Sequence, residues 1–137
     1  MLPKTHILLG AIFSILIYYF LGLSLFETSL IFLASFLIDF DHYIWHLNKK
    51  KNFNLKKAYF YLKEINLSKP LFMIFHTIEF LLLIFLISFL WEGFLFILIG
   101  MLFHSVLDIV QMAHDNELQY REFFFTCYLL SDKSNYD

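Results

Sequence analysis

The sequence predicts an all-α integral membrane protein, with four transmembrane helices and a short cytoplasmic interfacial helix between the second and the third. Hydrophobic residues make up 60% of the 137 residues and charged residues 16%, with a mean hydropathy of +0.68. Soluble domains are about 45–50% apolar and about 25% charged. The hydrophobic residues are also gathered into long runs, each sufficient to cross roughly 30 Å of hydrocarbon as a helix. Composition and distribution together therefore indicate a membrane protein.

The runs predict a single membrane domain, residues 1–137, with spans at about 5–25, 28–47, 70–90 and 92–112. Pro3 and Thr5 are typical helix-start residues for the first span, and Pro70 stands in the first turn of the third. The links at residues 22–27 and 91–93 are short, so the helices that they join are expected to be antiparallel.

The link between the second and third spans, residues 48–69, is strongly basic, with seven lysines against a single acidic residue, Glu64. Basic loops stay on the cytoplasmic side of a membrane. We therefore expect this link and both termini in the cytoplasm, and the protein in the plasma (inner) membrane. Leu55, Tyr59 and Leu62 recur at helical spacing and predict the interfacial helix, lying on anionic headgroups. A solvated basic loop is the alternative.

The C-terminal tail, residues 113–137, has an apolar stretch that is too short for a fifth span. This stretch, residues 118–130, predicts a helix that lies in the interface or docks on the bundle, with a disordered polar end.

Two residue counts exclude other classes. Cys127 is the only cysteine, so an internal disulfide is excluded. Nine of the ten cationic residues are lysines and Arg121 is the only arginine. This composition is not typical of a nucleic-acid interface, and we expect no nucleic-acid partner.

Histidines and carboxylates interrupt the apolar runs, where an isolated charge is costly. They are His6, Asp39, Asp41, His42, His76, Glu79, His104 and Asp108. In the predicted topology all of them lie in the cytoplasmic half of the bilayer. Asp39 with His42, His76 with Glu79, and His104 with Asp108 are three or four residues apart, a spacing that puts two side chains on one helix face.

Imidazole and carboxylate groups at one depth predict a divalent metal site. One or two zinc ions fit best, and Mn or Fe accept the same ligands. The predicted ligands are His6, Asp39, Asp41, His42, His76, His104 and Asp108. Asp39 and Asp41 cannot both face inward on a regular helix, so either the helix breaks there or one of them orients a ligand. The same groups could instead hydrogen-bond between helices without a metal.

The sequence resembles the membrane-bound metal-dependent hydrolase family, the YdjM-like, LexA-regulated inner-membrane proteins. The family's T-H, D-x-D-H, H-[ST] and H-x-x-x-D motifs correspond in order to Thr5-His6, Asp39-Phe40-Asp41-His42, His76-Thr77 and His104-Ser105-Val106-Leu107-Asp108. The resemblance covers most of the chain. The family's distant similarity to zinc-dependent phospholipase C and related nucleases implies phosphoester hydrolysis. Ile38 replaces the usual proline before D-x-D-H. The H-R that typically precedes the third motif is missing, and with it the obvious phosphate clamp.

The predicted function is metal-dependent hydrolysis of a lipid or other amphiphilic substrate at the cytoplasmic face. A bound divalent ion lowers the pKa of water towards about 7 and polarises the scissile bond. Glu79, one turn beyond His76, is the first candidate for the general base. Asp41 or Asp108 is expected to orient a ligand histidine. Membrane lipids are expected partners, and so small a bundle is compatible with a homo-oligomer.

Three other functions use the same residues. A di-iron oxidase or hydroxylase would use His42-x-x-x-His46 as one histidine box, although such sites take about eight histidines and this chain has six. A metal or proton transporter would need ionisable groups in the outer half of the bilayer, where the spans carry only Glu27 and Glu92. A non-catalytic membrane protein would bind no metal.

Overall fold

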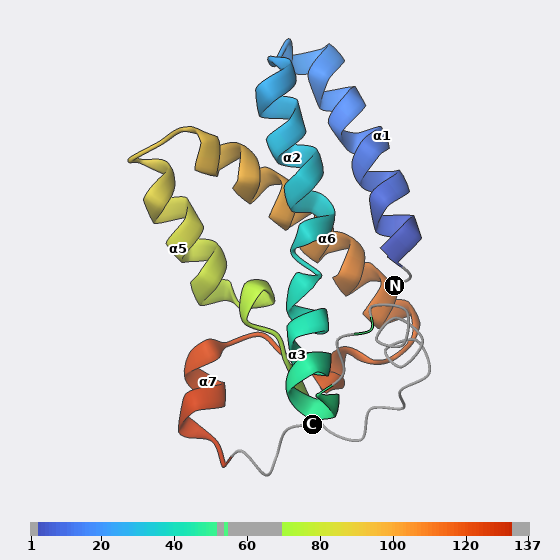
Figure 1. The fold of residues 1–137 in the computed structure, drawn as a ribbon, viewed down its shortest axis with the longest axis vertical. Helices are drawn as coiled ribbons and strands as arrows, with labels where there is room; N and C mark the ends of the chain where they lie inside the picture. Colours follow the sequence, from blue (N-terminus) through green and yellow to red (C-terminus); the bar gives the residue numbers. More distant parts are fainter. Residues whose placement is uncertain (1–2, 52–53, 55–69, 133–137) are drawn as a thin grey trace.

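The computed structural model describes residues 3–51, 54 and 70–132, and this part of the chain is mostly helical (Figure 1). Its elements in order are α1 (Pro3–Leu21), α2 (Leu25–Leu37), α3 (Phe40–Lys50), β1 (Leu71–Phe72), the 3-10 helix η1 (Ile74–His76), α5 (Ile78–Ser88), α6 (Gly93–His114), the 3-10 helix η2 (Leu118–Tyr120), β2 (Arg121–Glu122) and α7 (Phe125–Leu130). The helical fold class predicted from the sequence is confirmed.

Helices α1 and α2 form an antiparallel hairpin, and α6 packs against α2 and α5 (Figure 1). Gly22 ends α1 with φ 63°, a left-handed conformation that suits glycine. Ser24 then starts α2 with a capping box, because its side chain accepts from the Glu27 amide while the Glu27 carboxylate accepts from the Ser24 amide. These two local signals explain the tight turn between the helices.

Gly100 allows α6 to approach α2 closely. A Cβ atom at this position would overlap the carbonyl oxygen of Ile31 and lie 2.9 Å from the Cβ of Ala34. Only glycine therefore fits here without moving one helix. This contact places α6 beside the C-terminal half of α2. His104 of α6 can therefore approach Asp39, which follows α2.

The second predicted span is broken. Helix α2 ends at Leu37 and α3 begins at Phe40, and the Asp39 amide donates to the Phe36 carbonyl at 3.3 Å. A regular α-helix would have bonded that amide to the carbonyl of Ser35. From the spacing of Asp39 and Asp41 we expected either a broken helix or a carboxylate that orients a ligand, and the helix is broken.

The prediction of four spans is not supported. By length and composition two helical segments can cross a membrane, Leu25–Asn48 and Gly93–His114. The apolar parts of α1 and α5, Thr5–Leu21 and Ile78–Ser88, are shorter. Helix α1 is shorter than predicted because Gly22 ends it before the predicted boundary. Helix α5 is shorter because the chain before it is extended.

The third predicted span, residues 70–90, is helical only from Ile78. Leu71 pairs in parallel with Arg121, and Phe72 with Glu122, so the chain is extended before η1. Thr77 then caps α5 by accepting a hydrogen bond from the Phe80 amide at 3.3 Å.

The tail is likewise not one helix. It returns to the bundle through η2, β2 and α7, and it docks where Phe72 stacks on Tyr128 with ring centroids 3.8 Å apart. The predicted interfacial helix of the 48–69 link lies outside the described residues, apart from the end of α3 and residues 51 and 54.

Large apolar side chains lie on the surface, and the histidines of the site are buried. The side chain of Leu90 is 86% exposed, as are many other large apolar residues, whereas His104 is completely buried. A soluble monomer rarely exposes such extensive apolar surface.

Candidate metal centre

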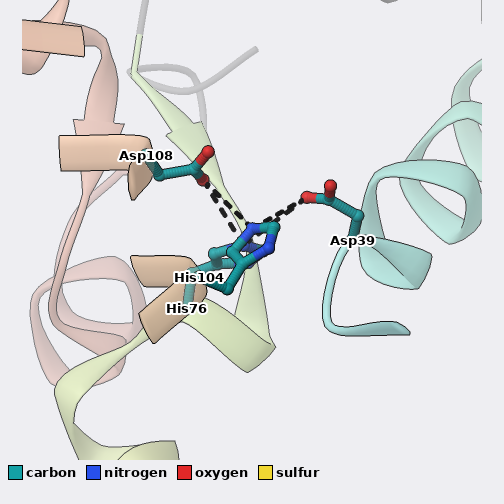
Figure 2. A group of neighbouring side chains, drawn as sticks. All are labelled: Asp39, His76, His104 and Asp108. Carbon is teal, nitrogen blue, oxygen red and sulfur yellow. Dashed lines mark hydrogen bonds and ion pairs between the residues drawn. The ribbon is translucent and has the colours of Figure 1, made fainter. Parts of the chain in front are cut away.

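Four side chains from different elements meet: Asp39 from the break between α2 and α3, His76 at the end of η1, and His104 and Asp108 from α6. We call them the His/Asp cluster. Figure 2 shows the two imidazole rings lying between the two carboxylates, which enter from opposite sides. One ligand atom from each residue lies within 4.8 Å of all the others. The structure therefore brings together residues that the sequence placed on separate spans.

The separations within the cluster match those of ligands around one small cation. His76 Nε2 and His104 Nε2 are 3.3 Å apart. Asp39 Oδ1 lies 3.8 Å and 3.2 Å from these two atoms, and Asp108 Oδ2 lies 3.6 Å and 3.5 Å from them. Four ligands arranged tetrahedrally at about 2.0–2.1 Å from zinc are about 3.3–3.4 Å apart. The donor set and its spacing fit a divalent ion.

The tautomers of the two histidines strengthen this fit. His104 Nδ1 donates to the Ser35 carbonyl at 2.8 Å, the acceptor that the helix break leaves available. His76 Nδ1 donates to Asp41 Oδ2 at 3.0 Å. In the neutral rings both Nε2 atoms are then lone-pair acceptors, and they face each other. Either a second proton on one ring or a cation between the rings is needed to stabilise the arrangement.

His6 adjoins the His/Asp cluster from α1. Its ring stacks on that of His104, with centroids 4.2 Å apart. Its Nε2 lies 3.2 Å from Asp108 Oδ1 and its Nδ1 3.9 Å from Asp39 Oδ2, yet neither nitrogen satisfies hydrogen-bond geometry among the described residues. A buried imidazole without a hydrogen bond is unusual in proteins. His6 is therefore placed to complete the ligand set.

Asp41 and His42 form a second group that shares His76 with the cluster. The Asp41 carboxylate accepts from His76 Nδ1 at 3.0 Å and from the Phe75 amide at 3.2 Å, and its other oxygen lies 3.0 Å from His42 Nδ1. His42 Nδ1 is also 3.4 Å from Asp39 Oδ1. Asp41 therefore contacts histidines on both sides, an arrangement that orients imidazole ligands in metal proteins.

Glu79 does not belong to either group. Its carboxylate accepts from the amides of Thr126 and Phe125 at 3.0 Å and 2.9 Å, at the start of α7. These backbone hydrogen bonds, from Thr126 first and then Phe125, lower the pKa of Glu79 from 4.5 to about 2. Glu79 lies outside both helical segments that are long enough to span a membrane. Glu79 therefore anchors the tail, and its role as general base stays a prediction that these contacts do not support.

Arg121 is the site residue that the sequence did not reveal. Its Nη1 donates to Asp108 Oδ2 at 2.9 Å, and its side chain is only 8% exposed. Pairing of β2 with β1 fixes its backbone, and its guanidinium carbon lies 5.5 Å from the centre of the Phe123 ring. The only signal in the sequence was that this is the sole arginine.

The fold and the site define a class: a helical protein with two helical segments of membrane-spanning length, one of them interrupted between α2 and α3, and a buried His/Asp group able to hold a metal ion. No protein-family model matches the chain, and no curated protein or solved structure matches it significantly.

Proposed function

We propose that this chain is a membrane-embedded metal-dependent hydrolase that acts on a lipid or other amphiphilic substrate at the cytoplasmic face of the plasma membrane. The observation that carries the proposal is the pair of inward-facing Nε2 atoms of His76 and His104, 3.3 Å apart, with both Nδ1 atoms engaged elsewhere. Asp39 and Asp108 supply the carboxylates, and His6 lies close enough to act as a further ligand.

The residues around the cluster support catalysis rather than a purely structural site. The side chains of Asp39 and His42 are 23% and 30% exposed, while the other residues of the His/Asp cluster are almost fully buried. The site is therefore open on one side. A catalytic metal site keeps such an opening for water and substrate, whereas structural sites are closed. When bound, a divalent ion would supply Lewis acidity and lower the pKa of a water molecule.

His42 replaces Glu79 as the candidate general base. Its Nδ1 lies 3.0 Å from Asp41 Oδ1, which favours the tautomer with the proton on Nδ1 and leaves Nε2 as a proton acceptor. The same carboxylate fixes His76. In this proposal Asp41 orients one imidazole as a ligand and the other as a base, and Asp39 and Asp108 hold the ion.

Elemental analysis of detergent-purified protein tests the metal site. We expect near-stoichiometric zinc, manganese or iron that falls sharply in His104→Ala and in Asp39→Ala. His114→Ala is the matched control, because His114 lies on the same helix but is exposed. A wild-type protein purified without chelators that holds no metal would overturn the proposal and favour hydrogen bonding between helices. Iron with an iron–oxo absorption band would favour the oxidase.

The general base has a separate test. We expect His42→Gln to retain the metal of the His/Asp cluster and to lose most hydrolysis of phospholipid in mixed micelles. If His42→Gln hydrolyses lipid at the wild-type rate, the assigned base is wrong. If the metal-loaded wild type stays at background on phospholipid, the hydrolase proposal itself fails.

A further inference from the structure

Arg121 brings a permanent positive charge to the candidate metal centre. Its Nη1 donates to Asp108 Oδ2 at 2.9 Å, and the two side chains are only 8% and 11% exposed. The same carboxylate oxygen lies 3.5 Å and 3.6 Å from the Nε2 atoms of His104 and His76. Among the side chains that the structure describes, Arg121 is the only lysine or arginine that contacts a carboxylate of this centre. Any ion held by Asp108 therefore lies next to a fixed cation.

The carboxylates of the centre outnumber this cation by two. Asp39, Asp41 and Asp108 carry three negative charges, and Arg121 carries one positive charge. Histidines that bind a metal are neutral, so they do not enter the balance. Two negative charges remain, and a single divalent ion compensates them. Because an uncompensated charge is costly in a buried site, this count favours one divalent ion.

The second group of possible ligands does not offer an independent site. It consists of Asp41, His42 and His76, and it shares His76 with the His/Asp cluster. His76 Nε2 faces His104 at 3.3 Å, while its Nδ1 donates to Asp41 at 3.0 Å. An ion in each group would need both ring nitrogens of His76 as ligands, and the ring would have to lose its Nδ1 proton. With that proton in place, only Asp41 and His42 are left for a second ion.

We propose that Arg121 sets the charge of the metal centre, so that the centre holds one divalent ion and discriminates against a second ion and against a trivalent one. This inference deepens the proposed function and rests on it. The guanidinium is always charged, and the pairing of β2 with β1 fixes its backbone. A second or a trivalent ion would add positive charge beside it that the three carboxylates do not balance. A di-iron oxidase depends on both kinds of excess charge, so Arg121 favours the hydrolase over that alternative.

Metal stoichiometry is the first test, and it uses the full-length wild-type protein. The protein is purified in detergent, equilibrated with excess zinc, desalted and subjected to elemental analysis. We expect one zinc ion per chain. Two zinc ions per chain would overturn the inference, and this result does not depend on the folding of any variant.

The iron-loaded protein tests the role of the charge, because its reduction potential compares the binding of a trivalent and a divalent ion at one site. Arg121→Gln removes the charge and Arg121→Lys keeps it. Lys51→Gln is the matched control, because it removes a cation at the exposed end of α3. We expect Arg121→Gln to favour the ferric over the ferrous ion roughly 10- to 100-fold, which lowers the potential by about 59 mV for each factor of ten.

The other two variants should keep a potential close to that of the wild type. An unchanged potential in Arg121→Gln would overturn the inference. An equal shift in Arg121→Lys would also overturn it, because the effect would then come from the shape of the side chain and not from its charge.

The two proposals fail in different ways. If the protein hydrolyses lipid but holds two ions, the inference about Arg121 is wrong and the hydrolase stands. If it holds one ion and Arg121→Gln lowers the potential, but no lipid is hydrolysed, the hydrolase is wrong and the role of Arg121 stands. A protein that holds no metal overturns both.

Discussion

Replacing Asp41 by asparagine separates two roles that its position allows. The carboxylate accepts from His76 Nδ1 at 3.0 Å and from the Phe75 amide at 3.2 Å, and it lies 3.0 Å from His42 Nδ1. It either orients these histidines or itself binds a second ion with them. Asparagine is nearly the same size, but it has one acceptor oxygen and turns an amide donor towards one of the imidazoles.

If Asp41 orients His76, we expect Asp41→Asn to weaken metal binding about 10- to 100-fold, the usual effect of losing such a partner. This corresponds to about 1.4–2.7 kcal/mol. The stoichiometry should stay the same, because the four residues of the His/Asp cluster are intact. Competition against a chromophoric zinc chelator measures the affinity, and elemental analysis measures the stoichiometry.

The control is Asp115→Asn. Asp115 also lies 3.0 Å from a neighbouring imidazole nitrogen, that of His114, but at the exposed end of α6. It should leave zinc binding unchanged. An unchanged affinity in Asp41→Asn would refute the orienting role. A loss of one of two bound ions, with the affinity of the other retained, would instead make Asp41 a ligand.

Four further predictions test the fold and the metal site. Gly100→Ala should destabilise the protein by about 1–3 kcal/mol, because the added methyl group meets the Ile31 carbonyl, and thermal unfolding in detergent measures the loss. Glu79→Gln should release α7, seen as faster motion of a spin label on Cys127, whereas Glu92→Gln should not. Because the folded pKa of Glu79 is lowered to about 2, its stabilisation of the tail is present above pH 4.5 and should be lost as pH falls from 4.5 towards 2. Removing the metal with a chelator should lower stability by about 2.7 kcal/mol where free metal had been at about 100 times its Kd.

The sequence predicted those parts of the site that depend on local spacing. His104 and Asp108 are four residues apart on a long helix, so their common face followed from helix geometry alone. His76 and Glu79 looked similar but are not on one helix, because His76 ends η1 and Thr77 caps α5. An apolar run does not reveal such a change of backbone, so the spacing of His76 and Glu79 does not put them on one helix face.

Non-local pairing explains why Arg121 was missed. Its position depends on β1–β2 pairing between residues 71–72 and 121–122, and neither strand is long enough to leave an alternating pattern in the sequence. The apolar composition of the tail predicts one helix instead of the η2, β2 and α7 that the structure has. The number of spans was overestimated for a related reason, since α5 is only 11 residues long although the apolar run around it is longer.

The break between α2 and α3 is the feature on which the cluster depends. On an unbroken helix Asp39 and Asp41 would point about 160° apart, and the Ser35 carbonyl would be bonded to the Asp39 amide. The break turns Asp39 towards His104 and Asp41 towards His76. It also leaves the Ser35 carbonyl to accept from His104 Nδ1, which points the lone pair of Nε2 at the cluster. One interruption thus positions both carboxylates and sets one tautomer at the candidate metal centre.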